Sequence, residues 1–538
     1  MFVFFHGYSP DTWDKMLATG LVGDNDGIRF QQSLDLPEEL KFNRLARKGG
    51  ELYNIIKERN CPFYIDRLQG GCYIDEYVYD QDLLDEYRTL LGDKFYGFQM
   101  HEWLSNYRGD ANKKLAELSA DEWNEENIKR VIFEKFPFKN LFLECMTLEE
   151  MAAAGKPLTA EQFYDNMTSI YKKRQKIGEL VPCDSSYLAY QFELQCGTKR
   201  IMPEVGAQTP DSRLQICYAR GMTRREGKSF GVYYEPWGGE PFSACAYNGS
   251  KNEWAMENGD FPFETYGPNG GSSRSLQKRI FLYSYLSGAE FISEEWGLYN
   301  TFLEGTKLEE LSPYGEVKRD FLNFVRKYND IGDKLTPIAA VLPEELTVLD
   351  KITETDSIFG YEIKNERFTS IKNGVRDVFA SSVPMLGSER EQKALKNSDM
   401  PDAIDLLNRD DGMLKKYDYL IDLTFGSDLK DKFSNICEAN DIPEILRKVL
   451  PCYVDGGLHW MVNECKGGGY YLTVFNHSGV ERSVEKGEYT LPEAEKTVTV
   501  SFKNEATPSL LEGKGKLSKE DGIYRLTIPA GEFAFIKF

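Results

Sequence analysis

One segment of the chain reads Phe230-Gly231-Val232-Tyr233-Tyr234-Glu235-Pro236-Trp237-Gly238-Gly239. A short apolar run, typical of a buried strand, ends on a carboxylate, and proline and glycine then turn the chain. Further on, Ser272 and Ser273 can cap a helix that Gly288 ends, and another short apolar run follows directly. This order of strand, helix and strand predicts parallel strands joined by helical crossovers.

The same alternation extends over about the first 300 of the 538 residues. Eight parallel strands, each followed by a helix, predict an α/β fold of the (β/α)8 or TIM-barrel type. The segment Asn140–Glu144 can also be a strand, and either Gly27–Gln31 or Glu179–Asp184 then drops out. The candidate strands are Met1–His6, Gly27–Gln31, Pro62–Asp66, Lys94–Met100, Glu179–Asp184, Lys199–Val205, Ser229–Tyr234 and Glu290–Ser293.

The rest of the chain divides into two further predicted domains. The barrel covers residues 1–330, a small open α/β domain with a packing or oligomerisation role covers 331–454, and an antiparallel β-sandwich covers 455–538. In the small domain the predicted strands are Pro337–Pro343, Asp377–Pro384 and Tyr417–Phe425, and the predicted helices are Ala403–Leu407 and Leu429–Ala439. In the last domain the predicted strand regions are Leu458–Asn463, Tyr470–Asn476, Thr497–Lys503 and Tyr524–Phe538.

The composition excludes several classes of partner. The chain has 86 acidic and 65 basic residues, a net charge of −21, and no basic stripe, so neither nucleic acid nor a membrane is an expected partner. No apolar run approaches the roughly 18 residues of a transmembrane helix, and the apolar start Met1–His6 lacks the basic residues of a signal peptide. The 10 cysteines form no CxxC pair and only four histidines occur, which favours buried thiols in a reducing cytoplasm without metal or cofactor.

Catalytic groups of such barrels lie at the C-terminal ends of the strands. Glu102 and Glu235 stand apart there, because each ends an apolar strand and is followed by Trp103 or by Pro236-Trp237. Sugar hydrolysis needs one protonated carboxylic acid and one ionised carboxylate, with aromatic faces that stack on the sugar. The other acidic residues at predicted strand ends are Asp66, Asp184, Glu204, Glu294 and Glu295.

These motifs resemble clan A of the glycoside hydrolases, and in layout the family 42 β-galactosidases. The segment Gly97-Phe98-Gln99-Met100-His101-Glu102 is similar to that family's fourth strand, approximately Gly-Trp-Gln-x-x-Asn-Glu, with one residue fewer. The family's seventh strand ends in a glutamate before a Gly/Pro-rich loop, a helix, a Gly-Ala step and an aromatic-capped eighth strand. Residues 234–239, 273–287, Gly288-Ala289 and Glu290–Trp296 follow that order, and the order of domains is similar across nearly the whole chain.

The resemblance implies a retaining glycoside hydrolase in which Glu102 is the acid/base and Glu235 the nucleophile. Its substrate would be a small β-linked sugar or oligosaccharide, a β-galactoside first. The resemblance also implies a homo-oligomer, a dimer or a trimer. His101 departs from the clan pattern, which has asparagine there, and a charged histidine can change both the pKa of Glu102 and the substrate choice.

Substrate-binding candidates flank the two carboxylates along the predicted strand ends. The guanidinium of Arg67 can orient a sugar hydroxyl or a carboxylate, or it can be a purely structural partner of Asp66 or Glu102. Three tryptophans are either sugar platforms or buried core residues, and Glu204 is the strongest rival for a catalytic role. The full set of binding candidates is His6, Asp66, Arg67, His101, Trp103, Glu204, Trp237 and Trp296.

Two other functions stay open at this point. A β-glycoside phosphorylase keeps the acid but needs a basic phosphate pocket in place of a nucleophilic Glu235, and a non-catalytic carbohydrate-binding barrel needs neither. The loop Tyr266–Ser273 lacks the Gly-Lys-Ser/Thr ending of a phosphate-binding loop, and none of the histidines follows a Gly-x-Ser-x-Gly motif. The sequence therefore favours carboxylate chemistry on a carbohydrate.

Overall fold

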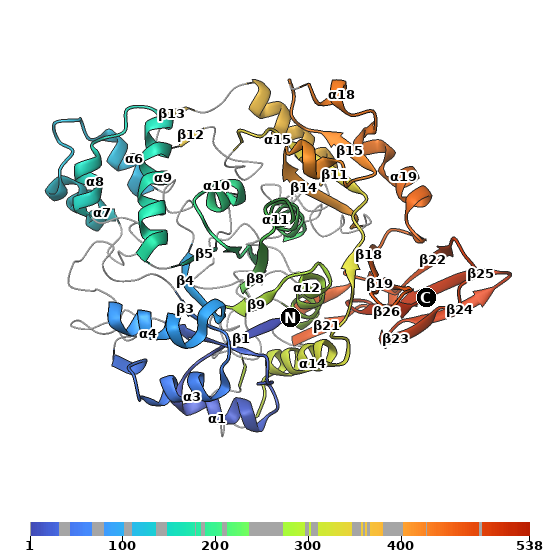
Figure 1. Ribbon diagram of the computed structural model, residues 1–538. Helices are drawn as coiled ribbons and strands as arrows, with labels where there is room; N and C mark the ends of the chain where they lie inside the picture. Colours follow the sequence, from blue (N-terminus) through green and yellow to red (C-terminus); the bar gives the residue numbers. More distant parts are fainter. Residues whose placement is uncertain are drawn as a thin grey trace.

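A barrel of parallel strands forms the first part of the molecule, followed by a smaller parallel sheet and by antiparallel sheets (Figure 1). The structure is a computed structural model. It describes residues 2–31, 44–66, 80–101, 110–135, 148–177, 179–183, 189–206, 212–235, 273–295, 301–302, 310–346, 357–358, 361–362, 366–379, 402–426, 428–483 and 487–538.

The barrel strands run parallel in the order β5-β4-β3-β2-β1-β9-β8-β6, and β7 also pairs with β8. Met202-Pro203 separates β6 from β7 within one barrel strand. The Met202 amide donates to the Pro182 carbonyl of β5 at 3.0 Å, and this bond joins the two ends of the sheet into a barrel. The bounds are β1 (Val3–Gly7), β2 (Gly27–Gln31), β3 (Phe63–Asp66), β4 (Phe95–His101), β5 (Leu180–Cys183), β6 (Arg200–Ile201), β7 (Glu204–Gly206), β8 (Ser229–Glu235) and β9 (Phe291–Glu294).

These strands confirm the predicted TIM barrel and all of its predicted strand positions. Both Gly27–Gln31 and the strand within Glu179–Asp184 belong to the barrel, so neither drops out. Asn140–Glu144 lies outside the described residues. The helix predicted after Ser273 is also confirmed, because the Ser273 hydroxyl accepts the Leu276 amide at 2.9 Å and Gly288 has a φ of +91°.

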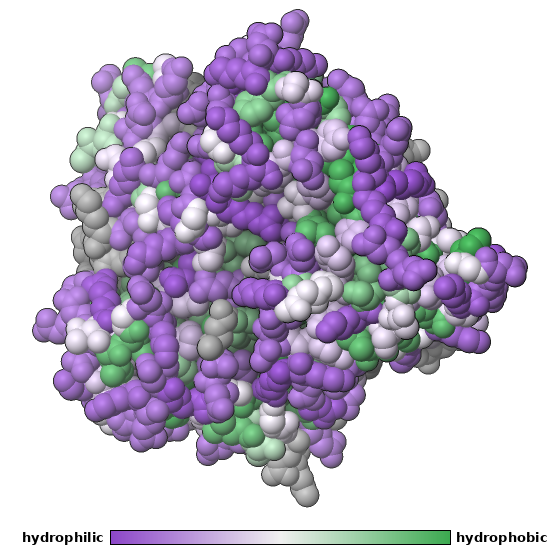
Figure 2. Space-filling view, turned by 45° about the vertical axis from the view of Figure 1, so that its right-hand side comes forward, coloured by the Kyte–Doolittle hydropathy of each residue, from purple (hydrophilic) through white to green (hydrophobic). Residues whose placement is uncertain are grey.

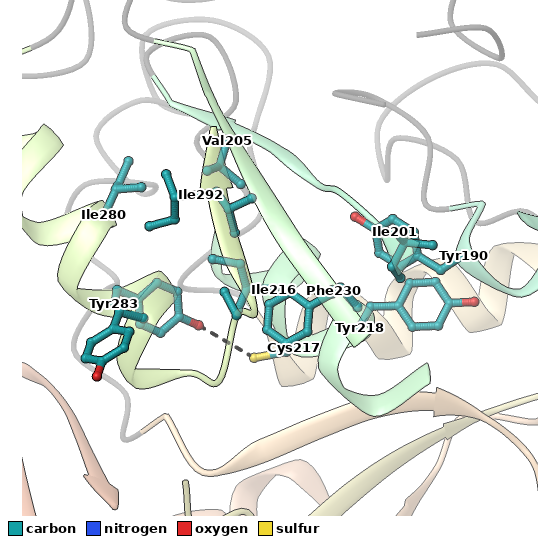
Figure 3. Close-up of a cluster of buried hydrophobic side chains, with 14 of the residues drawn as sticks. Tyr190, Ile201, Val205, Ile216, Cys217, Tyr218, Phe230, Ile280, Tyr283 and Ile292 are labelled. Carbon is teal, nitrogen blue, oxygen red and sulfur yellow. Dashed lines mark hydrogen bonds between the residues drawn. The ribbon is translucent and has the colours of Figure 1, made fainter. Parts of the chain in front are cut away.

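Helices cover the outside of the barrel (Figure 1). Their apolar faces meet the outward-facing strand residues: Val205, Phe230 and Ile292 lie against Ile216 of α11 and Ile280 of α12 (Figure 3). The described helices of this part are α1 (Pro10–Ala18), α3 (Glu51–Arg59), α4 (Gln81–Leu91), α6 (Asp110–Glu117), α7 (Glu125–Lys135), α8 (Leu148–Ala154), α9 (Ala160–Ile177), α10 (Tyr190–Gln195), α11 (Ser212–Glu226), α12 (Arg274–Leu286) and α14 (Pro313–Lys327).

The inward-facing residues of the strands form a separate apolar cluster. Successive side chains of a strand point to opposite faces, so Phe4 packs among the helices while its neighbours on both sides fill the barrel. Phe5, Tyr64 and Tyr96 meet edge to face there, with ring centroids 4.8 and 5.1 Å from Phe5. The interior cluster consists of Val3, Phe5, Tyr64, Tyr96, Val181, Cys183, Met202, Tyr233 and Phe291.

The second sheet is parallel, in the order β14-β11-β15-β16. Both helix predictions for this domain are wrong: in place of the helix Ala403–Leu407 the chain forms β14 from Ile404 onward, and the predicted helix Leu429–Ala439 ends at Lys432 before β16. The predicted strand Asp377–Pro384 is wrong at its start, where α15 still runs. The bounds are β11 (Ile338–Leu342), β14 (Ile404–Asn408), β15 (Tyr419–Asp422), β16 (Ile436–Cys437), β12 (Ser357–Ile358), β13 (Tyr361–Glu362), α15 (Glu366–Val378), α17 (Asp411–Leu414), α18 (Leu429–Lys432) and α19 (Ile442–Val449).

Two antiparallel sheets and a hairpin form the terminal part of the chain. One sheet has the order β10-β18-β19-β26-β23 and the other β17-β22-β25-β24. The first sheet includes β10, which lies within the range 331–454 predicted for the small domain. The second includes β17, which crosses the end of that range. The bounds are β10 (Asp333–Lys334), β17 (Cys452–Asp455), β18 (His459–Glu464), β19 (Tyr470–Phe475), β20 (Val480–Ser483), β21 (Gly487–Thr490), β22 (Lys496–Phe502), β23 (Ser509–Gly513), β24 (Lys516–Glu520), β25 (Ile523–Ile528) and β26 (Phe533–Lys537).

A buried cluster of charges lies where these three parts meet. Asp402, which precedes β14, accepts from Lys334 of β10 at 2.8 Å and lies 3.4 Å from the His459 imidazole of β18. Arg213 and Arg220 of α11 approach the same carboxylate at 3.8 and 3.9 Å. One buried carboxylate thus contacts the barrel, the parallel sheet and the terminal sheets.

The exposed face in Figure 2 is mostly hydrophilic, and its apolar residues form separate small patches. Among the described helices, none is both long and apolar enough to cross a membrane. The predicted oligomer stays a prediction.

The stability of the protein should fall as the pH falls from 7 to 5, partly through His459. Burial lowers the pKa of His459 below its ordinary 6.5, although Asp402 opposes this. The unfolded chain therefore binds a proton at a higher pH than the native chain, and the stabilisation present above pH 6.5 is lost on acidification. Urea unfolding at several pH values should show a shallower dependence in His459→Gln, by up to about 1.4 kcal/mol per pH unit.

Gly97→Ala should destabilise the barrel strongly. Gly97 has a φ of +89° at an irregularity of β4, and a Cβ atom there would lie 2.0 Å from the Glu179 carbonyl oxygen. We expect a loss of about 3 kcal/mol or more in urea unfolding. Gly49→Ala is the matched control, because its φ is +76° with no atom within 4 Å of the added Cβ. It should cost only about 1 kcal/mol, and equal losses would contradict the steric argument.

Candidate active site

Carboxylates lie at the C-terminal ends of several barrel strands. On β8, Tyr233 belongs to the interior cluster, and the alternation of the strand brings the next inward position to Glu235, which is 3% exposed. The same two-residue step leads from Tyr64 to Asp66 on β3 and from Met202 to Glu204 on β7. Glu295 continues the β9 ladder, since its amide donates to the Tyr234 carbonyl at 2.9 Å. The acidic groups therefore gather at one end of the barrel interior.

Arg29 of β2 connects opposite walls of the barrel. Its Nη2 donates to the Tyr233 hydroxyl at 3.0 Å and to the Asp66 carboxylate, while its Nη1 donates to the Glu294 carbonyl oxygen. In the sheet, β1 and β9 separate β2 from β8, so the bond to Tyr233 crosses the interior. Arg29 and Asp66 are each 2% exposed. The guanidinium thus fixes the strand ends on which Asp66 and Glu235 lie.

The electrostatics of this group follow from burial and pairing. Burial disfavours the charge of the guanidinium, but the adjacent Asp66 carboxylate outweighs it and holds the pKa of Arg29 well above its ordinary value. Burial raises the pKa of Tyr64 and of Tyr233 far above the usual range of a phenol, so both hydroxyls stay protonated. Tyr64 also bonds to the Ser293 hydroxyl of β9 at 2.5 Å, a second link across the barrel.

Glu204 and Glu235 lie on paired strands. Glu204 stands opposite Tyr233 and Gly206 opposite Glu235 in the parallel register of β7 and β8. Gly206 has a φ of +147°, and a Cβ atom there would lie 1.8 Å from the Glu235 carbonyl oxygen, so only glycine allows this close approach. Glu204 is 4% exposed. The geometry keeps Glu204 beside the predicted nucleophile.

His6 lies on the other side of the barrel wall. It follows Phe4 on the outward face of β1, with ring centroids 5.0 Å apart, and its Nε2 lies 3.2 Å from the Asp26 carboxylate. Asp26 also accepts the Gly23 amide at 2.7 Å. These contacts hold His6 among the helices, outside the barrel interior where the acidic groups gather.

Glu294 points outward as well, although it precedes Glu295. Lys318 of α14 forms an ion pair with its carboxylate, and Gln277 of α12 donates to it at 3.3 Å. Lys318 also donates to the Thr301 hydroxyl at 2.7 Å. The acidic pair at the end of β9 is therefore divided, with Glu294 in the helix layer.

Several predicted site residues lie wholly or partly outside the described residues. Only the backbone of His101 is described, at the end of β4 opposite Cys183. The residues outside the described ranges are Arg67, Glu102, Trp103, Trp237 and Trp296. Their roles stay predictions.

Arg29 is the main residue that the sequence reasoning missed. It lies in the middle of Gly27-Ile28-Arg29-Phe30-Gln31, for which the sequence predicts only a strand. An arginine within a predicted barrel strand is itself a signal, because a charge that is buried there needs a partner. Across the described residues, no group of three or more His, Cys, Asp or Glu side chains could hold a metal ion.

No family model matches the chain, and a search of curated proteins finds no match. Among solved structures, a polyextremophilic β-galactosidase from the Antarctic haloarchaeon Halorubrum lacusprofundi is similar at 10% identity, covering 100% of this chain and 99% of that protein, with a TM-score of 0.41. An α-amylase from H. orenii is similar at 10% identity with the same coverage and a TM-score of 0.33. At these values the similarity identifies neither family nor substrate, and the fold assignment depends on the strand order itself.

Arg29→Met should destabilise the protein by about 3–5 kcal/mol in urea unfolding, because it leaves the Asp66 charge buried without its partner. Adding Asp66→Asn removes that charge at nearly constant shape, so the double variant should recover at least half of the loss. A double variant less stable than Arg29→Met would contradict the pairing.

Proposed function

We propose that this chain is a glycoside hydrolase that cleaves a small β-linked sugar or oligosaccharide at the C-terminal end of its barrel. The observation that carries the proposal is the position of Glu235, a buried carboxylate on the inward face at the end of β8. The neighbouring strand ends add Glu204 and Glu295, and Asp66 comes from the end of β3. Glycosidic bond cleavage requires a pair of carboxyl groups, one protonated and one ionised.

In the proposed mechanism the Glu235 carboxylate attacks the anomeric carbon while Glu102 gives its proton to the leaving oxygen. The bond to the leaving group breaks and a glycosyl–Glu235 ester forms. Glu102 then takes a proton from water, whose oxygen attacks the anomeric carbon and releases Glu235. The two displacements retain the anomeric configuration and require carboxyl groups about 5 to 5.5 Å apart.

Arg29 and Asp66 have supporting roles in this proposal. Arg29 keeps the β2, β3 and β8 ends together, and its positive charge lies within the same interior as the nucleophile. The Oδ1 atom of Asp66 has no hydrogen-bond partner among the described residues, which suits an acceptor for a sugar hydroxyl. Glu204 and His101 complete the proposed binding set, with Arg67, Trp103, Trp237 and Trp296 as the sequence predicts. We expect a β-galactoside as substrate and exo action on imported oligosaccharides in the cytoplasm.

A panel of nitrophenyl glycosides tests the function directly. We expect hydrolysis of a β-glycoside, a fall in kcat of about 1,000-fold or more in Glu102→Gln and Glu235→Gln, and no change in Glu316→Gln, an exposed residue of α14. With Glu235→Gly, azide should restore turnover and give a glycosyl azide of the opposite anomeric configuration.

Each other outcome selects a different function. Release of a sugar 1-phosphate only when phosphate is supplied would identify a phosphorylase. Sugar binding in the wild type and in both glutamine variants, with no turnover of any glycoside, would identify a non-catalytic carbohydrate-binding barrel and overturn the proposal.

A further inference from the structure

The terminal hairpin β20–β21 reaches the barrel at the start of α12. Glu488 of β21 accepts the backbone amide of Arg274 at 2.8 Å and that of Ser275 at 3.2 Å, one on each carboxylate oxygen. The Arg274 guanidinium also lies 3.2 Å from Glu488 and over the Tyr314 ring at 4.9 Å. Figure 1 shows β21 beside α12 and α14. One side chain of the terminal part thus binds the first two residues of a barrel helix.

This end of α12 lies on the catalytic face of the barrel. The helix follows β8 and leads back to the start of β9, so its first residues are at the C-terminal end of the strands. Residues 236–272 alone connect Glu235 with the Ser273 cap. The first turn of α12 therefore lies at the same end of the barrel strands as the predicted nucleophile.

Glu488 and Ser273 together satisfy the start of this helix. The first amides of a helix have no partner within it, and among the described residues the Ser273 hydroxyl accepts the Leu276 amide alone. Glu488 accepts the two amides before it and brings a negative charge to the positive end of the helix dipole. The helix start therefore depends on a residue from another part of the chain.

α12 in turn contacts the strand ends next to two buried carboxylates. Gln277, one turn into the helix, donates to Glu294, which precedes Glu295. The Phe281 ring packs against Tyr234, which precedes Glu235, at a centroid distance of 5.1 Å. A shift of the helix start would thus be felt at the ends of both β8 and β9.

We propose that Glu488 is a positioning residue of the active site: through α12 it holds the strand ends that carry Glu235 and Glu295. This inference rests on the proposed glycoside hydrolase function and adds that the terminal hairpin is part of the catalytic unit.

The test compares Glu488→Ala and Glu488→Gln with Glu532→Gln. Glu532 is the matched control, because it binds Lys278 of the same helix at 3.2 Å from the same part of the chain but accepts none of the amides at the helix start. We expect kcat on the best nitrophenyl glycoside to fall at least tenfold in Glu488→Ala and less in Glu488→Gln, which keeps one acceptor oxygen. Glu532→Gln should stay within twofold of the wild type, and KM should change little in all three.

Hydrogen–deuterium exchange gives a readout that does not require turnover. In Glu488→Ala, exchange should become faster in peptides covering 274–282 and 290–295 and stay unchanged in β22 and β25. Unchanged kcat and exchange, an equal loss in Glu532→Gln, or faster exchange throughout the chain would overturn the proposal. If the wild type hydrolyses no glycoside, the proposed function fails, and local exchange then decides alone whether Glu488 holds these strand ends.

Discussion

The buried pair of Arg29 and Asp66 is the interaction on which the half of the barrel near the C-terminal ends of its strands depends. A guanidinium inside a barrel is costly to desolvate, and it is stable there only because a carboxylate, a phenol and a backbone carbonyl surround it. These partners come from β3, β8 and β9, so the charge sets the relative positions of strands that are not neighbours in the sheet. Toward the N-terminal ends of the strands the barrel interior is aromatic and aliphatic, and at their C-terminal ends the strands carry carboxylates. Arg29 therefore marks the boundary between a packed core and a polar site.

The alternation of strand residues decides which acidic groups face that site. Glu294 and Glu295 are neighbours in sequence, yet Lys318 and Gln277 hold Glu294 in the helix layer. The backbone of Glu295 instead continues the hydrogen bonding between β9 and β8. His6 follows the same rule on the outward face of β1. A carboxylate or an imidazole at a strand end is thus a candidate site residue only when the alternation of side chains turns it toward the barrel interior. The buried residues earlier in each strand show which positions these are.

The sequence predicted the barrel well because each barrel strand is a short apolar run bounded by turn residues, and that signal is local. It failed at Ala403–Leu407, where a fully buried strand has no alternation to separate it from a buried helix. Asp405 within that strand pairs with Arg220 at 2.6 Å, a partner 185 residues away that no local pattern reveals. The partners of Arg29 likewise come from three other strands, so the sequence shows that this charge needs a partner but not which groups supply it. The position of Glu235 at the end of a barrel strand was predictable, since an apolar run and the following loop are both local features.

The contacts between the parts of the chain differ in what they contribute. Asp402 and Lys334 are fully buried, and the cost of removing both charges from water is large, so we expect this cluster to fix one orientation of the terminal sheets rather than to add much net stability. Other orientations would leave a carboxylate without its partners. Glu488 is only partly buried and is therefore cheaper to desolvate, but it acts only if the hairpin arrives within hydrogen-bond distance of two particular amides. The buried cluster can supply that accuracy. In this way the buried charges around Asp402 can hold the hairpin in the one position in which Glu488 binds the start of α12.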